Sequence, residues 1–257
     1  MTRPLAIDLF CGLGGWSEGL LAEGWEVIGF DIEAHAYDGE RYPGQLVLQD
    51  VLTLHGSQFA AADLIVASPP CQFFSYTAMP WSRAKALAAE VRADPEKLAE
   101  RLALFKACFR LQQEASEASG RHVPMVVENV RGAEKWVGRS RGNLGSYYLW
   151  GDVPALMPVA AARKVSGFRF DGSGRSFQTA AVAEHIKNGG GSWFKIGSPG
   201  QKVTGQNPDG RLWKRDPVAS CSSNSPKRKA ASAKIAKIPE ALSRHIARVY
   251  LPREAAA

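Results

Sequence analysis

Short apolar segments alternate with helical patterns along the first 150 residues, and this alternation limits the fold more than any other feature. The apolar segments cover residues 5–10, 26–30, 46–48, 64–67 and 124–128, with a later one at 147–150. Strands that alternate with helices predict an α/β fold with a doubly wound, mostly parallel, Rossmann-like sheet. In such a sheet, ligands bind beyond the carboxyl ends of the strands.

The predicted strands end in residues that can bind a ligand, namely Gly12, Asp31, Asp50, Cys71 and Glu128. A glycine turn between the first strand and the first helix allows a ligand to approach the backbone closely. No basic residue lies near this turn, which favours a ligand with an amino-acid end over a pyrophosphate. Asp31 can accept hydrogen bonds from both hydroxyls of a ribose, and Asp50 can accept one from an adenine amino group.

Cys71 follows a buried strand and two prolines, Pro69 and Pro70, which stop the strand and form a stiff turn. A lone cysteine is usually a buried structural residue. Together with Glu128, however, it suits attack on a heteroaromatic ring. The thiolate adds to an electron-poor carbon, and the acid engages a ring nitrogen.

Three segments, Asp8–Gly15, Pro69–Gln72 and Glu128–Val130, resemble the first, fourth and sixth motifs of the DNA cytosine-5 methyltransferases. The resemblance implies methyl transfer from S-adenosyl-L-methionine to C5 of a flipped-out cytosine in double-stranded DNA, which leaves S-adenosyl-L-homocysteine. It makes Cys71 the nucleophile that bonds to C6, and Glu128 the partner of N3. The implied cofactor-binding residues are Phe10, Gly12, Leu13, Gly14, Gly15, Asp31, Ile32, Asp50, Val51, Pro70 and Ala236.

Two motifs depart from the family pattern. The family carries an arginine pair directly before a late strand, whereas Arg139-Ser-Arg141 lies several residues before the strand 147–150. Arg141, and after it Arg139, is the candidate for contact with the flipped base, and the alternative is a solvated basic loop. Ala236 stands where the family has an asparagine near the cofactor.

Positive charge is concentrated in the second part of the chain. The net charge is +7, and residues 151–257 hold 18 basic against 7 acidic residues. The predicted organisation is a catalytic domain at 1–162, a small loop-rich target-recognition segment at 163–231, and a helix at 232–257 that returns to the catalytic domain. So short a segment predicts a site of roughly two or three bases and phosphate contacts by Lys195, Arg211, Lys214, Arg215, Lys227, Arg228 and Lys229. Trp193, Phe194 and Trp213 either stack on bases or form core.

The remaining expectations concern cellular setting. The four cysteines form no C-x-x-C pair and no apolar run approaches 18 residues, so we expect no metal site, no membrane span and no signal peptide. We expect a cytoplasmic monomer from a prokaryotic or phage-encoded context that acts on host DNA, with restriction–modification as one setting. Two alternatives remain: an RNA (tRNA) cytosine-5 methyltransferase, and a non-catalytic DNA-binding regulator of the same fold.

Overall fold

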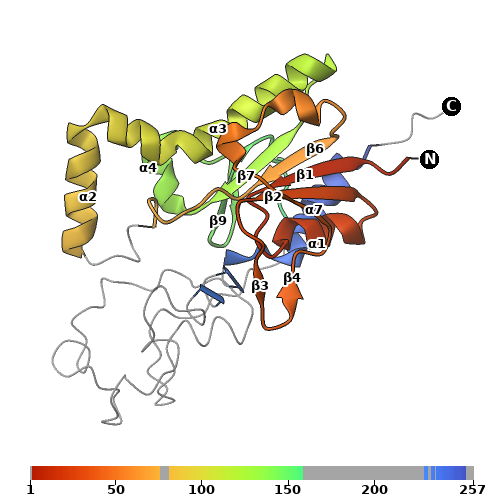
Figure 1. The fold of residues 1–257 in the computed structure, drawn as a ribbon, viewed down its shortest axis with the longest axis horizontal. Coiled ribbons are helices and arrows are strands. Elements are labelled where there is room, and N and C mark those ends of the chain that lie inside the picture. Colours follow the sequence, from red (N-terminus) through yellow and green to blue (C-terminus); the bar gives the residue numbers. More distant parts are fainter. Residues whose placement is uncertain (1, 76–80, 159–228, 231–232, 235, 253–257) are drawn as a thin grey trace, which may run out of the picture. The chain divides into compact units, whose positions relative to one another are not determined.

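The computed structural model describes residues 2–75, 81–158, 229–230, 233–234 and 236–252. The chain divides into two compact units, residues 1–160 with 238–257 and residues 161–237. The described elements of the first unit are shown in Figure 1. The predicted recognition segment, 163–231, falls almost entirely outside the described residues and stays a prediction.

A seven-stranded sheet with the order β5-β2-β1-β6-β7-β9-β8 forms the centre of the first unit. The first five strands in this order are parallel, and β9 and β8 continue the sheet antiparallel. The prediction of an α/β, mostly parallel fold is therefore confirmed. The strands are β1 (Leu5–Leu9), β2 (Glu26–Asp31), β5 (Gln45–Leu48), β6 (Leu64–Ala67), β7 (Met125–Asn129), β8 (Gly142–Leu144) and β9 (Tyr147–Gly151).

The strand order reverses between β1 and β6, which are hydrogen-bonded neighbours at the middle of the sheet. The chain runs from β1 outward to β2 and β5, then returns to β6 and continues to β7 on the other side. Loops at such a reversal diverge from each other, and ligands bind between them at the carboxyl ends of the strands. This rule places the ligand between the glycine turn after β1 and the Pro69-Pro70-Cys71 segment after β6.

Helices cover both faces of the sheet, with α3 on one face and α1 and α7 on the other (Figure 1). On the α3 face, the sheet contributes Ile7, Ile65, Met125 and Val127 to an apolar cluster with buried residues of α3 such as Leu111. The helices are α1 (Gly15–Ala22), α2 (Trp81–Ala93), α3 (Pro95–Ser119), α4 (Glu134–Val137) and α7 (Glu240–Tyr250). Three short 3-10 helices are η1 (Val51–Thr53), η2 (Gly56–Phe59) and η4 (Arg131–Ala133).

The boundary between α2 and α3 falls at Asp94. The Asp94 carboxylate Oδ1 accepts hydrogen bonds from the backbone N–H groups of Glu96 and Lys97, both at 3.1 Å. Pro95 follows in the first turn of α3, where its missing N–H costs nothing. The second helix therefore starts afresh with its own cap.

The helix α7, from the far end of the chain, packs against α1. Trp25, just after α1, is 1% exposed, and its indole N–H donates to the carbonyl of Ala247 at 3.2 Å. Glu23 pairs with Arg244 at 2.6 Å and with Arg248 at 2.9 Å. These bonds join the two ends of the chain into one unit.

Among the elements that the sequence did not predict are a small hairpin and an edge strand. Residues 36–41 form a small hairpin of β3 (Ala36–Tyr37) and β4 (Glu40–Arg41), whose turn uses the positive φ angles of Asp38 and Gly39. Residues 142–144, for which no strand was predicted, form β8 at the edge of the sheet. Within the described ranges, no helix has both the length and the apolar character needed to cross a membrane.

Candidate active site

The turn after β1 has an unusual backbone. Phe10, Gly12 and Gly14 all have positive φ angles, of 58°, 52° and 81°. A Cβ on Gly14 would collide with the ring of Pro43, whereas a Cβ on Gly12 would meet no atom within 4 Å. Gly14 is therefore required by both conformation and packing, and the space above Gly12 is open to a ligand.

Asp31 connects the ends of β2 and β1. Its Oδ2 accepts a hydrogen bond from the Gly12 backbone N–H at 2.9 Å, and its Oδ1 accepts one from the Glu33 backbone at 3.2 Å. His35 Nε2 lies 3.6 Å from Oδ1. The predicted ribose-binding carboxylate thus also holds the glycine turn in place, and each oxygen keeps a further lone pair for a ligand hydroxyl.

The residues predicted to face an adenine lie at the next strand ends. Asp50 caps η1, because its Oδ1 accepts from the Leu52 backbone N–H at 2.9 Å. Val51 is 1% exposed, whereas Ile32, just after β2, is 75% exposed. An apolar side chain left exposed beside two ligand-type carboxylates fits the edge of a flat ring.

A buried polar cluster lies under the glycine turn. Asp8, in β1, is 1% exposed; its Oδ2 accepts a hydrogen bond from the Ser17 hydroxyl at 2.6 Å, and Tyr42 OH lies 2.7 Å from the same hydroxyl. Asp8 Oδ1 is buried and has no hydrogen-bond partner among the described residues. Burial, partly offset by the Ser17 hydrogen bond, raises the pKa of Asp8 from 3.8 to about 7. Burial also raises the pKa of the Cys11 thiol far above its ordinary value, so Cys11 is not a reactive thiolate.

Cys71 lies just after β6, in a segment whose first residue, Ser68, is hydrogen-bonded to the end of β1. Ser68 N–H donates to the carbonyl of Leu9 at 3.2 Å, and the Ser68 hydroxyl accepts from the indole N–H of Trp16 at 3.0 Å. The Cys71 carbonyl accepts from the backbone N–H groups of Phe74 and Ser75 at 3.0 and 2.9 Å. The chain therefore turns directly after Cys71, whose side chain is partly exposed, whereas Cys11 and Cys108 are buried.

Glu128 lies near the end of the neighbouring strand β7 and is 5% exposed. Its neighbour Asn129 is also buried, and donates from Nδ2 to the carbonyl of Pro69 at 2.9 Å. Asn129 Oδ1 accepts from the Val130 backbone N–H at 2.8 Å. One amide side chain thus fixes the exit of β7 to the proline segment that carries Cys71.

Tyr147 is a further buried group near Glu128. It is 3% exposed, and burial, reinforced by the negative charge of Glu128, raises the pKa of its phenol above its ordinary value. The phenol therefore stays protonated at neutral pH. Nothing in the sequence indicated this pairing, because the spacing of 19 residues between them is bridged by an antiparallel strand pair.

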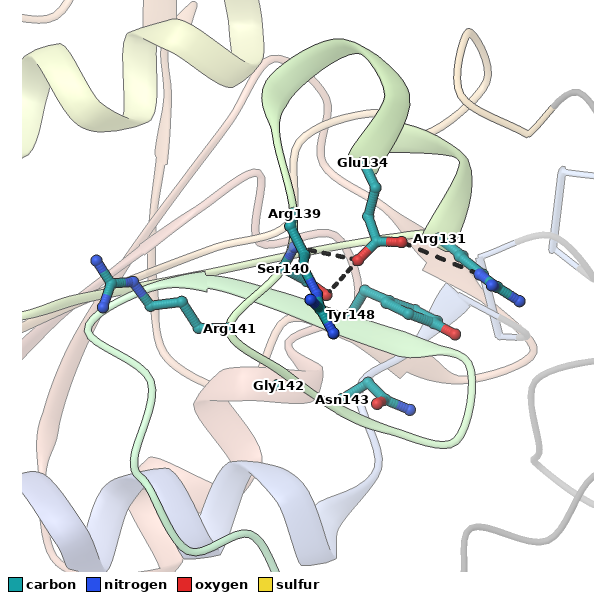
Figure 2. A pocket seen from close by; sticks show the side chains of 8 residues that line it. All are labelled: Arg131, Glu134, Arg139, Ser140, Arg141, Gly142, Asn143 and Tyr148. Carbon is teal, nitrogen blue, oxygen red and sulfur yellow. Dashed lines mark hydrogen bonds and ion pairs between the residues drawn. The ribbon is translucent and has the colours of Figure 1, made fainter.

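Arg139 and Arg141 line a pocket of about 650 Å³ beside β8 and β9 (Figure 2). Arg131, which the sequence analysis did not single out, lines the same pocket. Glu134 Oε1 accepts hydrogen bonds from the Ser140 backbone N–H at 3.1 Å and hydroxyl at 2.7 Å, and its Oε2 lies 4.0 Å from Arg131 Nε. The two predicted arginines are thus brought together with a third.

Other predicted residues lie elsewhere. Ala236 is exposed and belongs to the second unit, so its predicted role at the cofactor stays a prediction. Lys229 is exposed as well. The other predicted DNA contacts lie outside the described residues: Lys195, Arg211, Lys214, Arg215, Lys227, Arg228, Trp193, Phe194 and Trp213. In the part of the chain that the structure describes, no group of three or more His, Cys, Asp or Glu side chains could hold a metal ion.

Residues 5–82, which contain the glycine turn, Asp31, Asp50 and Cys71, match the family model of the C-5 cytosine-specific DNA methylases. This part of the chain is similar to the DNA cytosine-5 methyltransferases. The match covers the predicted first and fourth motifs and ends before Glu128. The hydrogen bonds of Asp31 to Gly12 and of Ser68 to Leu9 therefore lie inside the matched region, whereas Asn129 lies outside it.

Solved structures similar to this chain include a candidate DNA modification methyltransferase encoded within a prophage (E. coli), with 24% identity, 53% of this chain and 35% of the other covered, and a TM-score of 0.34. S. pombe Dnmt2 methyltransferase is 19% identical, with 52% and 36% covered and a TM-score of 0.32. The Entamoeba histolytica methyltransferase EhMeth is 13% identical, with 73% and 61% covered and a TM-score of 0.41. The chain spans about a third of the length of the first two. No curated protein matches the chain significantly, so the family assignment rests on residues 5–82.

Proposed function

We propose that this protein transfers a methyl group from S-adenosyl-L-methionine to C5 of a flipped-out cytosine in duplex DNA. The observation that supports this most directly is the placement of Cys71 after β6 and of Glu128 near the end of the neighbouring parallel strand β7, since the exits of the two strands are joined by the Asn129–Pro69 hydrogen bond. A nucleophile and an acid on two rigid strand ends that are hydrogen-bonded to each other can react with two atoms of one ring.

The proposed reaction begins when the target cytosine rotates out of the duplex, which costs a few kcal/mol. The Cys71 thiolate adds to C6, and the electron pair of the C5–C6 bond moves toward C5 and the ring nitrogen N3. Glu128 stabilises this charge by sharing a proton with N3. C5 then takes the methyl group, a base removes the C5 proton, and the electrons of that bond expel the Cys71 thiolate.

The residues of the glycine turn fit the proposed donor. Open space above Gly12 and the Asp31 carboxylate at the same turn suit a ligand with an amino-acid end and a ribose. The exposed side chain of Ile32 and the capping residue Asp50 would flank its adenine. When bound, S-adenosyl-L-methionine supplies an electrophilic methyl group, and the protein supplies its position.

The substrate assignment to DNA is part of the proposal, as is the short recognition sequence expected from residues 163–231. Methylation of a cytosine in tRNA would use the same cysteine and glutamate. A regulator without catalytic activity would keep the fold without needing either residue. Both alternatives are outcomes of the experiment that follows.

The test is covalent trapping on duplex DNA that contains 5-fluorocytosine, in the presence of the methyl donor. The fluorine on C5 cannot leave as a proton does, so the bond between Cys71 and C6 persists and shifts the protein on a denaturing gel. Peptide mapping should place the adduct on Cys71. Cys71→Ser should abolish adduct formation and methyl transfer, and should leave binding of S-adenosyl-L-homocysteine unchanged.

Cys108→Ser is the matched control, because Cys108 is 0% exposed within α3 and far along the chain from the site. This variant should form the adduct as the wild type does. Methyl transfer by Cys71→Ser, or an adduct on another residue, would refute the mechanism. Trapping on tRNA in preference to DNA would favour the RNA alternative, and donor binding without transfer to either would favour the regulator.

A further inference from the structure

The pocket beside β8 and β9 has more positive charge than its own residues neutralise. Three arginines, Arg131, Arg139 and Arg141, line it together with one carboxylate, that of Glu134. Hydrogen bonds from Ser140, the hydroxyl first, hold the pKa of Glu134 below its ordinary value, so this carboxylate is ionised at neutral pH. The side chains around the pocket therefore carry a net charge of about +2, counted from three arginines and one glutamate.

Within the described part of the chain, the guanidinium groups of Arg139 and Arg141 make no hydrogen bond or ion pair. The dashed lines in Figure 2 mark the side-chain interactions of Glu134, which are with Ser140 and with Arg131. Both Glu134 oxygens are thus engaged. The two guanidinium groups have ten N–H donors between them, and none of these donors has a hydrogen-bond acceptor among the described residues.

The pocket adjoins the strand that carries Glu128. Tyr148, which lines the pocket, is the register partner of Asn129 in the β7–β9 pair. Arg131 follows Asn129 by two residues, at the start of η4. A nucleotide whose base reaches Glu128 would therefore bring its own backbone toward this pocket.

We propose that this pocket binds the phosphate backbone of the nucleic-acid substrate, next to the nucleotide whose base enters the site of Cys71 and Glu128. This inference rests on the proposed function, and it gives Arg139 and Arg141 a role at phosphates in place of the base contact predicted from the sequence. An arginine matches phosphate oxygens through two parallel hydrogen bonds. Because Arg141 points away from Arg139 (Figure 2), the two would contact different phosphates. A neutral cytosine edge would leave the excess positive charge of the pocket unbalanced.

The test uses the salt dependence of DNA binding, because each phosphate contact releases counterions when it forms. Dissociation constants for duplex DNA are measured between about 50 and 200 mM salt for wild type, Arg139→Gln, Arg141→Gln and the double variant. Each single substitution should reduce the slope of log K against log salt by about 0.9, and should weaken binding roughly fivefold at physiological salt. The loss should be the same for cognate and non-cognate sequences.

Arg3→Gln is the matched control, because Arg3 is exposed and precedes β1, at the amino ends of the parallel strands and so away from the site. It should leave the slope unchanged. Slopes of Arg139→Gln and Arg141→Gln equal to that of the wild type would overturn the phosphate assignment, as would a loss of kcat at saturating DNA without a change in slope. If the two substitutions changed the slope for binding of tRNA but not of DNA, the pocket would still be a phosphate site, but one for RNA.

The binding measurement can be made in the Cys71→Ser background, where no methyl transfer occurs. Failure of the wild type to transfer a methyl group would then refute the proposed function through activity alone. The pocket assignment would stand or fall independently, on the slopes. Far-ultraviolet circular dichroism of each variant would establish that a loss of binding does not come from unfolding.

Discussion

Backbone groups shape the site at the ends of β1 and β2, whereas side chains shape it at the ends of β6 and β7. At the first place, here named the cofactor edge (Phe10–Gly15 with Asp31), left-handed backbone angles and a carboxylate on the Gly12 N–H define the surface. At the second, the reacting edge (Pro69–Cys71 with Glu128 and Asn129), one amide side chain joins two strand exits. The hydrogen bond that holds the cofactor edge joins residues 19 positions apart, whereas the one that holds the reacting edge joins residues 60 positions apart.

This difference predicts that a substitution at one edge impairs the function of that edge alone. The largest effect is expected for Glu128→Gln, which should lower kcat without changing affinity for the cofactor product. Glutamine keeps the shape of this buried side chain but cannot share a proton with N3. We expect kcat to fall by about 10²- to 10⁴-fold, the usual contribution of a positioned acid. Affinity for S-adenosyl-L-homocysteine, measured by calorimetry, should stay unchanged, and a weaker affinity would mean that the edges are not independent.

Gly14→Ala tests the cofactor edge, through its effect on the free energy of unfolding. The added Cβ collides with Pro43 and is forced into a left-handed backbone, so the free energy of unfolding should fall by about 2–4 kcal/mol. Gly12→Ala adds the same atom at a similar φ angle but into open space, and should cost only about 1–2 kcal/mol. Urea unfolding of both variants measures the difference, and equal losses would contradict the role of Pro43.

Asn129→Ala should loosen the reacting edge without touching the cofactor edge. It leaves the carbonyl of Pro69 without its donor, which costs roughly 1–3 kcal/mol of stability for a buried group. We expect kcat to fall about tenfold, because a small displacement of Cys71 relative to Glu128 disturbs the attack geometry. An unchanged kcat together with reduced stability would show that Asn129 serves folding alone.

Asp8→Asn should have the smallest effect on activity, and its signature is a change in the pH dependence of stability. The pKa of Asp8 is raised to about 7 in the folded protein, so between about pH 4 and 7 the folded state keeps a proton that the unfolded chain has lost. This contribution to stability is complete below the unfolded pKa and is lost as the pH rises through 7. The asparagine keeps an acceptor for Ser17 and removes the titration, so the variant should gain roughly 1 kcal/mol relative to wild type for each pH unit in this window. The measurement is the free energy of unfolding of both proteins at several pH values. A difference between variant and wild type that does not change with pH would contradict the raised pKa.

The candidate residues of the cofactor edge could be picked out from the sequence because their signals are local, and their role at a cofactor stays a prediction. A glycine at a left-handed position and an acidic residue at a strand end can be recognised from neighbouring residues alone. The boundary between α2 and α3 depends on signals that are just as local, since Asp94 and Pro95 are adjacent. The fold class followed from the alternation of such local patterns.

The reacting edge was predicted only in its two chemical residues. The bond between Asn129 and Pro69, and the proximity of Tyr147 to Glu128, depend on which strands become neighbours. Arg131 was missed for the same reason, because nothing near it in the sequence indicates that it meets Arg139 in one pocket. β8 was missed because Gly142 and Asn143 favour turns over strands.

Helix α7 follows residues 161–237 in the sequence, but it belongs to the first unit and packs against α1. During synthesis, the sheet therefore emerges with α1 still uncovered, and the unit cannot close until the last helix has been made. The same arrangement makes residues 161–237 an internal insertion whose two ends are anchored by one scaffold. Changes in the length of such a segment should therefore cost the sheet little stability.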